Sequence, residues 1–198
     1  GTVALAAPAP RRGGAAPPQS SAQFRGLLES IVSMSLRTKV KVLQCEVLPA
    51  SDEVARQLGI KPGSLVQKAV RVRCIRQGPM SHITTHVPQM FAKGFGRREL
   101  ARKPLLMLLE ESGVEIGRAS QGISARLADV PVARALDVDV GSALLAVQRL
   151  VYDASERPVQ WLQGLYRPDR YQYQMQLSRV GEIDAKVWVS TELSAQFH

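Results

Sequence analysis

The stretches VARQLGIKPGS (residues 54–64) and VARALDVDVGS (residues 132–142) decide the fold of this chain, because they are two copies of one unit. A shift of 78 positions, from residue 54 to residue 132, aligns the VAR triplet, the following leucine and the Gly-Ser pair. The same shift carries Arg71 onto Arg149. This ordered set of matches indicates an internal duplication. Two copies are too few for a solenoid, which needs at least about three repeats.

Each copy predicts a short helix, a Gly-Ser turn and two strands joined by a tight turn. The first helix covers residues 52–58 and ends at Gly59, since glycine is favoured just after a helix. Strands at 65–76 and 79–87 flank a Gln-Gly pair, which has the turn chemistry of a hairpin. The second copy predicts strands at 143–152 and 158–166 in the same order.

The segments around the two copies add three further elements. Alternating valines and lysines predict a strand at 39–47, and PLLMLLEES predicts a helix at 104–112 that stops before Gly113. Apolar residues at helical spacing predict a helix over 22–34. We expect an α+β fold in which both hairpins share one antiparallel sheet about a pseudo-twofold axis, with flanking helices covering one face.

Composition places the chain among folded proteins. It has 198 residues, 45% of them hydrophobic and 22% charged, enough for one ordinary domain and an appendage. No stretch approaches the ~18 uncharged apolar residues of a membrane helix, and the start lacks the charged segment of a secretory signal. Cys45 and Cys74 are too few for a disulfide framework, so we expect a cytoplasmic protein.

The charge balance favours anionic partners. Lysine and arginine total 26 against 17 acids, which gives a net charge of +9. The basic residues are scattered, however, and the one dense patch, at 97–103, has no stacking aromatics among them. We therefore expect no nucleic-acid surface within this chain.

No catalytic motif or metal site stands out. His82 and His86 lie four apart on an expected strand and so face the same side, but no third ligand accompanies them. Phosphate-binding loops, nucleophile elbows and metalloprotease motifs are missing from the sequence. We therefore predict no metal, no cofactor and no enzymatic activity.

Arginines within the expected strands are the most informative residues. Arg71 and Arg73 are two apart in VRVRC and so project from one face of an apolar strand. A guanidinium on a covered sheet face is costly unless an anion or carbonyl satisfies it. Two interpretations stay open: a structural role, in an ion pair with a residue such as Asp169 or on an exposed sheet face, and a site for an anionic ligand.

The order of these motifs resembles the UTRA domain, the effector-binding part of HutC-type members of the GntR family of bacterial transcription regulators. The likeness covers residues 24–180. The matching features are the two Gly-Ser pairs, the Ala-Asp pair before the second helix, the arginine of the second copy and a Tyr-Arg-x-Asp-Arg-Tyr motif.

The resemblance implies a division of the chain and of the protein. Residues 1–3 would close the wing of a winged-helix DNA-binding head that is missing here, and residues 4–22, rich in Ala and Pro, would be a linker. Residues 23–180 would form the effector-binding and dimerisation domain, with a C-terminal tail at 181–198. The implied fold is chorismate-lyase-like, and the implied assembly is a homodimer.

The resemblance also implies ligand-binding positions. In phosphosugar-binding members, two arginines match Arg71 and Arg73, and a Glu and a Tyr match Gln160 and Tyr166. An expected acid near Ile83 is absent, and Pro104 and Leu106 replace a Ser-x-Tyr pair, which indicates a drier pocket. We expect a small anionic metabolite, a carboxylate rather than a phosphosugar. The candidate ligand-binding residues are Arg71, Arg73, Thr85, His86, Gln160 and Tyr166.

The functional prediction is a non-catalytic sensor domain of a transcriptional regulator, a repressor by its resemblance, that alters DNA binding by the absent head and has no membrane partner. Two alternatives stay open. A lyase of the same fold would need a buried carboxylate opposite the arginines, and a ligand-free dimerisation module would fill the space over them with its own side chains.

Overall fold

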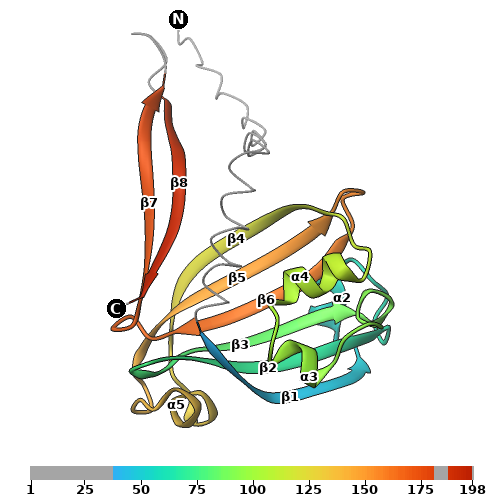
Figure 1. Ribbon diagram of the computed structural model, residues 1–198, viewed down its shortest axis with the longest axis horizontal. Coiled ribbons are helices and arrows are strands. Elements are labelled where there is room, and N and C mark those ends of the chain that lie inside the picture. Colours follow the sequence, from blue (N-terminus) through green and yellow to red (C-terminus); the bar gives the residue numbers. More distant parts are fainter. Residues whose placement is uncertain (1–37, 181–186, 198) are drawn as a thin grey trace, which may run out of the picture.

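The protein, seen in a computed structural model that describes residues 38–180 and 187–197, is built on one six-stranded antiparallel sheet (Figure 1). The expected wing, linker and helix at 22–34 lie outside the described residues. The five strands expected from the sequence, β1, β2, β3, β5 and β6, begin and end within two residues of the expected bounds. The sheet contains β1 (Lys39–Pro49), β2 (Leu65–Ile75), β3 (Gly78–Pro88), β4 (Ile116–Leu127), β5 (Ala143–Asp153) and β6 (Pro158–Tyr166).

The strand order shows the duplication directly. The sheet reads β1-β2-β3-β6-β5-β4, so the first three strands and the second three run outward from the β3–β6 pair in matching order. At the centre, Thr84 pairs with Gln163 and Ile83 with Gly164. The expectation of one antiparallel sheet shared by both hairpins is confirmed. It follows that equivalent residues of the two units face each other across β3 and β6.

The duplicated helices α2 (Asp52–Leu58) and α5 (Val130–Leu136) have equivalent caps and packing. Side chains of Ser51 and Asp129 cap their N-termini, and each helix is followed by a left-handed residue. Each helix crosses to the other unit, because α2 packs on β6 and α5 packs on β3. Both lie on the same face of the sheet, toward its two ends.

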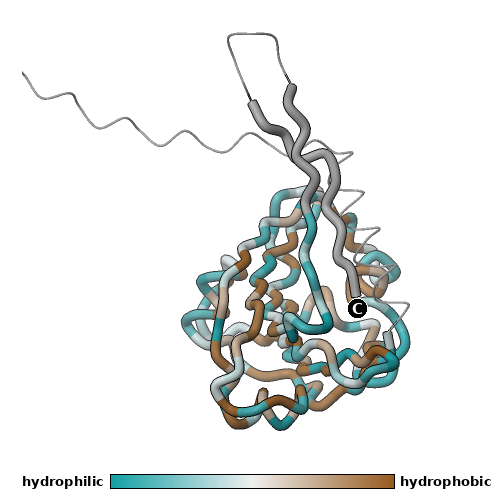
Figure 2. The backbone as a smooth tube through the Cα atoms, turned by 90° about the vertical axis from the view of Figure 1, so that its left-hand side faces the viewer, coloured by the Kyte–Doolittle hydropathy of each residue, from teal (hydrophilic) through white to brown (hydrophobic). Residues whose placement is uncertain are grey.

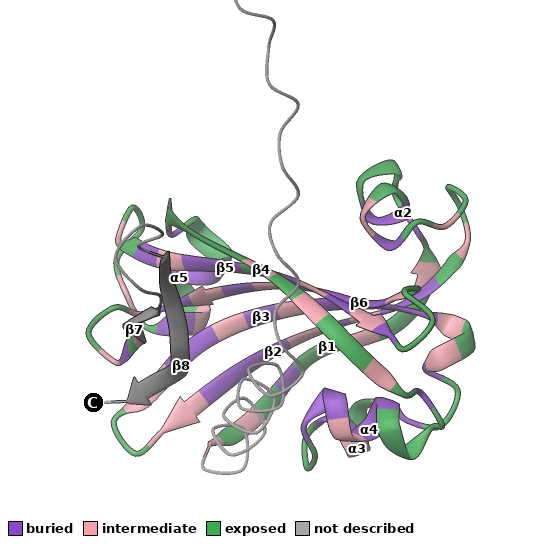
Figure 3. Ribbon diagram, turned by 90° about the horizontal axis from the view of Figure 1, so that it is seen from above, coloured by how far each residue is buried: buried purple, intermediate pink, exposed green. Residues whose placement is uncertain are grey.

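The connection between the units covers the other face. It holds a short 3-10 helix (Gln89–Phe91), α3 (Arg97–Leu100) and α4 (Leu105–Glu111), which lie on the opposite side of the sheet from α2 (Figure 3). Buried leucines of α4 pack there against Ala69, Val87 and Val151 of the strands. The expectation that helices cover only one face is therefore wrong. Hydrophobic and hydrophilic residues both occur along the strands of the sheet (Figure 2).

Two regions were not expected from the sequence. Strand β4 forms an edge of the sheet and is mostly exposed. The expected C-terminal tail at 181–198 includes β8 (Val187–Phe197), which pairs with β7 (Tyr171–Val180) in a separate hairpin (Figure 1). Within the described residues, no helix has the length and apolar character needed to cross a membrane.

Candidate functional site

Strand register gathers the candidate residues on the sheet face beneath α4. Arg71 pairs with Ile83 of β3, which pairs with Gly164 of β6. Arg73 pairs with Ser81, which in turn pairs with Tyr166. Directly paired residues of an antiparallel sheet project to the same face, so Arg71, Arg73 and Tyr166 share one face.

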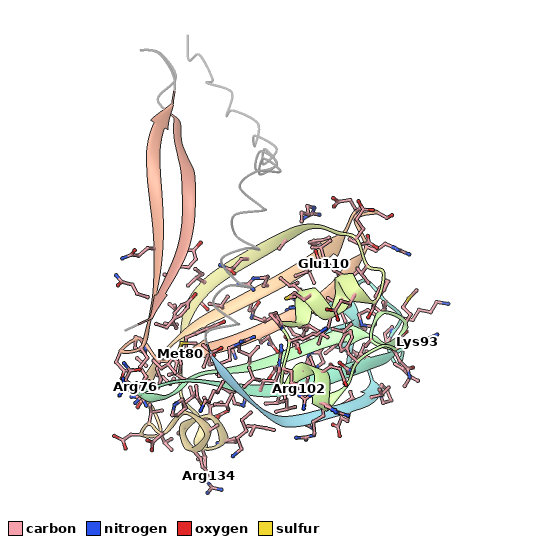
Figure 4. The ribbon with its side chains drawn as sticks, in the orientation of Figure 1. Arg76, Met80, Lys93, Arg102, Glu110 and Arg134 are labelled. Atoms are coloured by element: carbon pink, nitrogen blue, oxygen red, sulfur yellow. The ribbon has the colours of Figure 1, made fainter. Side chains whose placement is uncertain are left out.

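A cavity of about 40 Å³ opens among these side chains. It lies between β2, β3, β6 and β5, and the start of α4 forms its roof. By this measure it has room for a few water molecules, each of which needs at least about 10–15 Å³. Met80, labelled in Figure 4, is one of its apolar walls. The lining residues are Arg71, Arg73, Met80, Ile83, Pro104, Leu105, Leu106, Arg149, Gln160, Leu162 and Tyr166.

Arg71 carries a buried charge with little compensation. It is 2% exposed, and its Nε and Nη1 atoms have no hydrogen-bond partner among residues 38–180 and 187–197. Burial and the neighbouring charge of Arg73 lower the pKa of Arg71 to about 9. No Asp or Glu occurs among the residues that line the cavity, all of which lie in the described part of the chain. The site therefore holds a guanidinium whose natural partner is an anion.

The other two arginines have neutral partners within the described residues. Arg73 donates from Nη1 to the hydroxyl of Thr38 at 3.0 Å. Arg149 donates from Nε to the side-chain oxygen of Gln121 at 2.8 Å. Burial lowers the pKa of both, and the charge of Arg149 lowers that of Arg73 further. The hydrogen bond to Gln121 holds the Arg149 side chain in place without cancelling its charge.

Asp169 does not provide the expected counter-charge. Its carboxylate accepts a hydrogen bond from Arg167 at 2.7 Å and lies 3.9 Å from Arg170. Arg167 also donates to the carbonyls of Leu136 and Asp137. The acid of the Tyr-Arg-x-Asp-Arg-Tyr motif thus ties the end of β6 to α5, away from the strand arginines.

Tyr166 occupies the centre of the site. Its side chain lines the cavity together with those of Arg71, Arg73 and Arg149. The ring lies over Gly164, where an added Cβ would come within 2.6 Å of the Tyr166 Cε2 atom. Behind it, the ring of Tyr171 packs at a centroid distance of 4.3 Å. Gly164 is therefore required for the position of the tyrosine.

The remaining candidates divide between the two faces of the sheet. Gln160 lines the cavity, and its buried Oε1 atom has no partner in the described part of the chain. Thr85 is on the same face, but its hydroxyl donates a hydrogen bond to the carbonyl of Ala69, and it does not line the cavity. His86 lies on the opposite face, where its ring stacks on that of Trp161 with the two ring centroids 5.6 Å apart. The structure brings together Arg71, Arg73, Gln160 and Tyr166 and leaves Thr85 and His86 outside.

The position of His86 predicts a pH effect on stability. Burial, with a smaller contribution from Lys68, lowers the pKa of His86 to about 4. In the unfolded chain the histidine has a pKa near 6.5 and binds a proton more readily than in the folded protein. The free energy of unfolding therefore falls as pH drops from 6.5 toward 4. We expect a loss of about 1 kcal/mol per pH unit between pH 6.5 and 5.

Urea unfolding at a series of pH values measures this loss. The change in the free energy of unfolding per pH unit should be smaller in His86→Gln, because glutamine cannot titrate. An unchanged dependence on pH in that variant would contradict the assignment to His86.

Two residues of the site were missed in the sequence-based list. Arg149 lines the cavity, and its signal was its equivalence to Arg71 in the duplication. Gln121 belongs to the unexpected strand β4, and nothing in its sequence context pointed to a role. Within the described residues, His82 and His86 belong to no group of three His, Cys, Asp or Glu side chains placed to hold a metal.

Comparisons with known proteins agree with this architecture. The family model of the UTRA domain matches residues 33–172. Over 172 residues the chain is 31% identical to the HTH-type transcriptional regulator Rv0792c of Mycobacterium tuberculosis, covering 77% of this chain and 61% of that protein. It is 22% identical to the HTH-type transcriptional repressor NagR of Bacillus subtilis, and the match covers 77% of this chain and 63% of that protein. The chain thus spans about three fifths of the length of these relatives.

A solved structure supports the same relationship. The ligand-binding domain of a GntR-family transcriptional regulator from Bordetella bronchiseptica superposes with a TM-score of 0.68 at 31% sequence identity. The match covers 72% of this chain and 92% of that domain. The six-stranded antiparallel sheet with its helices is the chorismate-lyase-like fold of such effector domains. The chain therefore belongs to the UTRA domain family of GntR-type transcription regulators.

Proposed function

We propose that this chain is the effector-binding domain of a DNA-binding transcription regulator, and that its effector is a small carboxylate held in the arginine pocket. The relatives that it matches are transcription regulators, one of them a repressor. The similar Bordetella domain is described as ligand-binding. The pocket gives this role a chemical basis.

The observation that carries the proposal is the buried guanidinium of Arg71, two nitrogens of which have no partner within the residues that the structure describes. Burying a charge without a partner costs several kcal/mol or more. A carboxylate arriving from solvent supplies both a counter-charge and acceptors for the Nε–H and Nη1–H groups. Charge-assisted hydrogen bonds of this type are about twice as strong as neutral ones. The unsatisfied group thus favours the bound state.

The rest of the lining favours a small carboxylate over a phosphosugar. Pro104, Leu105 and Leu106 form an apolar roof, which offers no partners to sugar hydroxyls. A hydroxyl buried without a hydrogen bond costs about 1–3 kcal/mol. The cavity of about 40 Å³ is also small. An acid with a short apolar body suits these walls.

We infer that the site binds its ligand without converting it. The ionisable groups in the lining are three guanidiniums and the phenol of Tyr166, and a lyase would need a proton-donating acid opposite the arginines. Incubation of the chain with chorismate should yield no 4-hydroxybenzoate. Its formation, followed by absorbance, would establish the lyase alternative.

The wider assembly is part of the proposal. We propose a cytoplasmic homodimer whose two DNA-binding heads precede residue 4, joined through the linker at 4–22. Ligand binding would bias the arrangement of the heads with a coupling free energy of about 1–3 kcal/mol. Such a bias requires that the ligand bind one arrangement better than the other.

The test is a thermal shift measurement on the purified chain. Acetate, benzoate, succinate and glucose 6-phosphate are added at equal ionic strength. At least one carboxylate should raise the melting temperature more than the sugar phosphate does, and Arg71→Met should remove that response. A full response in the Arg71→Met variant, or no response of the wild-type chain to any carboxylate, would refute the proposed site.

A further inference from the structure

The duplication places two basic walls opposite each other across the pocket. Arg71 on β2 and Arg149 on β5 occupy equivalent positions in the two units, with β3 and β6 between them. Neighbouring strands lie about 4.8 Å apart, so the backbones of β2 and β5 are separated by roughly 14 Å. Arg149 pairs with Leu162 of β6, another residue of the cavity face. Both arginines therefore approach the cavity on one face, from opposite sides.

The space between the walls is apolar. Ile83 and Leu162 form the floor, and Leu105 and Leu106 of α4 form the roof. Tyr166, whose ring lies over Gly164 of the central strand β6, lines the same cavity as the arginines of both walls. A ligand spanning this space needs charge at its two ends and carbon between them.

The number of positive charges exceeds what a single carboxylate can compensate. Arg71 and Arg149 are both buried, and the side chain that accepts hydrogen bonds from Arg149, Gln121, is neutral. One carboxylate on Arg71 leaves the charge on the far wall uncompensated. A phosphate group carries its two charges at one point, so it too would leave the charge of the arginine on the far wall uncompensated.

From these features, and resting on the proposed function, we propose that the effector is a short dicarboxylate. One carboxylate binds Arg71 and Arg73, the other binds Arg149, and the carbon skeleton lies on the apolar floor. Arg149 thereby determines specificity for two charges over one. The pocket has pseudo-twofold symmetry, and a ligand with an acid at each end matches it.

Isothermal titration of the purified chain tests this with matched acids. Malonate, succinate and glutarate are compared with propionate, butyrate and valerate, which have the same numbers of carbons but one carboxylate. We expect at least one diacid to bind about tenfold or more tightly than its monoacid, a difference of about 1.4 kcal/mol. Inorganic phosphate should bind more weakly than that diacid.

Variants locate the second carboxylate. Arg149→Gln should weaken the preferred diacid about tenfold and leave its monoacid nearly unchanged. Arg126→Gln removes the same charge from an exposed position on β4 and should change neither affinity. If Arg149→Gln fails to fold, the comparison of acids on the wild-type chain decides alone.

The outcomes separate this inference from the proposed function. Equal binding of each diacid and its monoacid, equal weakening of both by Arg149→Gln, or tighter binding of phosphate would overturn the dicarboxylate. In those cases, if a monoacid still binds and its binding depends on Arg71, the proposed carboxylate site remains supported. No binding of any carboxylate would overturn both.

Discussion

Replacing Arg71 with methionine is expected to raise the melting temperature of the ligand-free protein. The side chain is 2% exposed and two of its nitrogens lack partners among the described residues, so a poorly compensated charge is buried there. Methionine keeps much of the length and removes the charge, including its repulsion of Arg73. Apolar replacement of buried ionic groups stabilises proteins by about 1–4 kcal/mol in favourable cases. A gain of that size raises Tm by roughly 3–10 °C in a domain of this length.

Calorimetry of ligand-free protein measures the effect. Arg76→Met is the matched control, since Arg76 is exposed and follows the end of β2, and its substitution removes the same charge (Figure 4). The control should leave Tm nearly unchanged. A lower Tm in Arg71→Met would mean that Arg71 stabilises the fold, which contradicts its assignment to a ligand.

Gly164→Ala is expected to damage both the fold and the site. The new Cβ would lie 2.6 Å from the Tyr166 Cε2 atom and 3.2 Å from its hydroxyl oxygen, so the ring must move. Overpacking of this kind costs about 1–3 kcal/mol. The displaced ring no longer lies between the arginines. The thermal shift produced by a bound carboxylate should therefore shrink in this variant.

Gly122→Ala provides the control for that experiment. Gly122 also lies in a strand of the sheet, but a Cβ there meets no atom within 4 Å. Its stability should change by no more than about 0.5 kcal/mol. If Gly164→Ala binds carboxylates as well as the control does, Tyr166 has no central role in the site.

The two repeated units could be predicted from the sequence, because their capping residues, turn residues and strand patterns all indicate the same elements. Each helix has a capping residue before it and a Gly-Ser turn after it, and each hairpin has its own turn residues. Strand β4 escaped prediction because RASQGIS carries no alternation of apolar and polar residues. As an exposed edge strand it buries neither face fully, so its sequence is under little constraint from packing.

The site was predictable where strand periodicity applies. Arg71 and Arg73 lie two apart and share a face, as expected. Thr85 and His86 are neighbours in one strand, so they had to project to opposite faces, and both could not line one pocket. Arg149 follows from the duplication once the strand order is known. The apolar roof depends on α4, whose position over the pocket comes from tertiary packing alone.

The most direct measurement of the central claim is the NMR resonance of the Arg71 Nε–H group. We expect this resonance, assigned by its loss in Arg71→Met, to shift when acetate, benzoate or succinate is titrated into the wild-type chain. Side-chain signals of exposed arginines such as Arg126 should stay in place. A resonance of Arg71 that does not move at saturating concentrations of all three acids would show that this guanidinium receives no anion from solution.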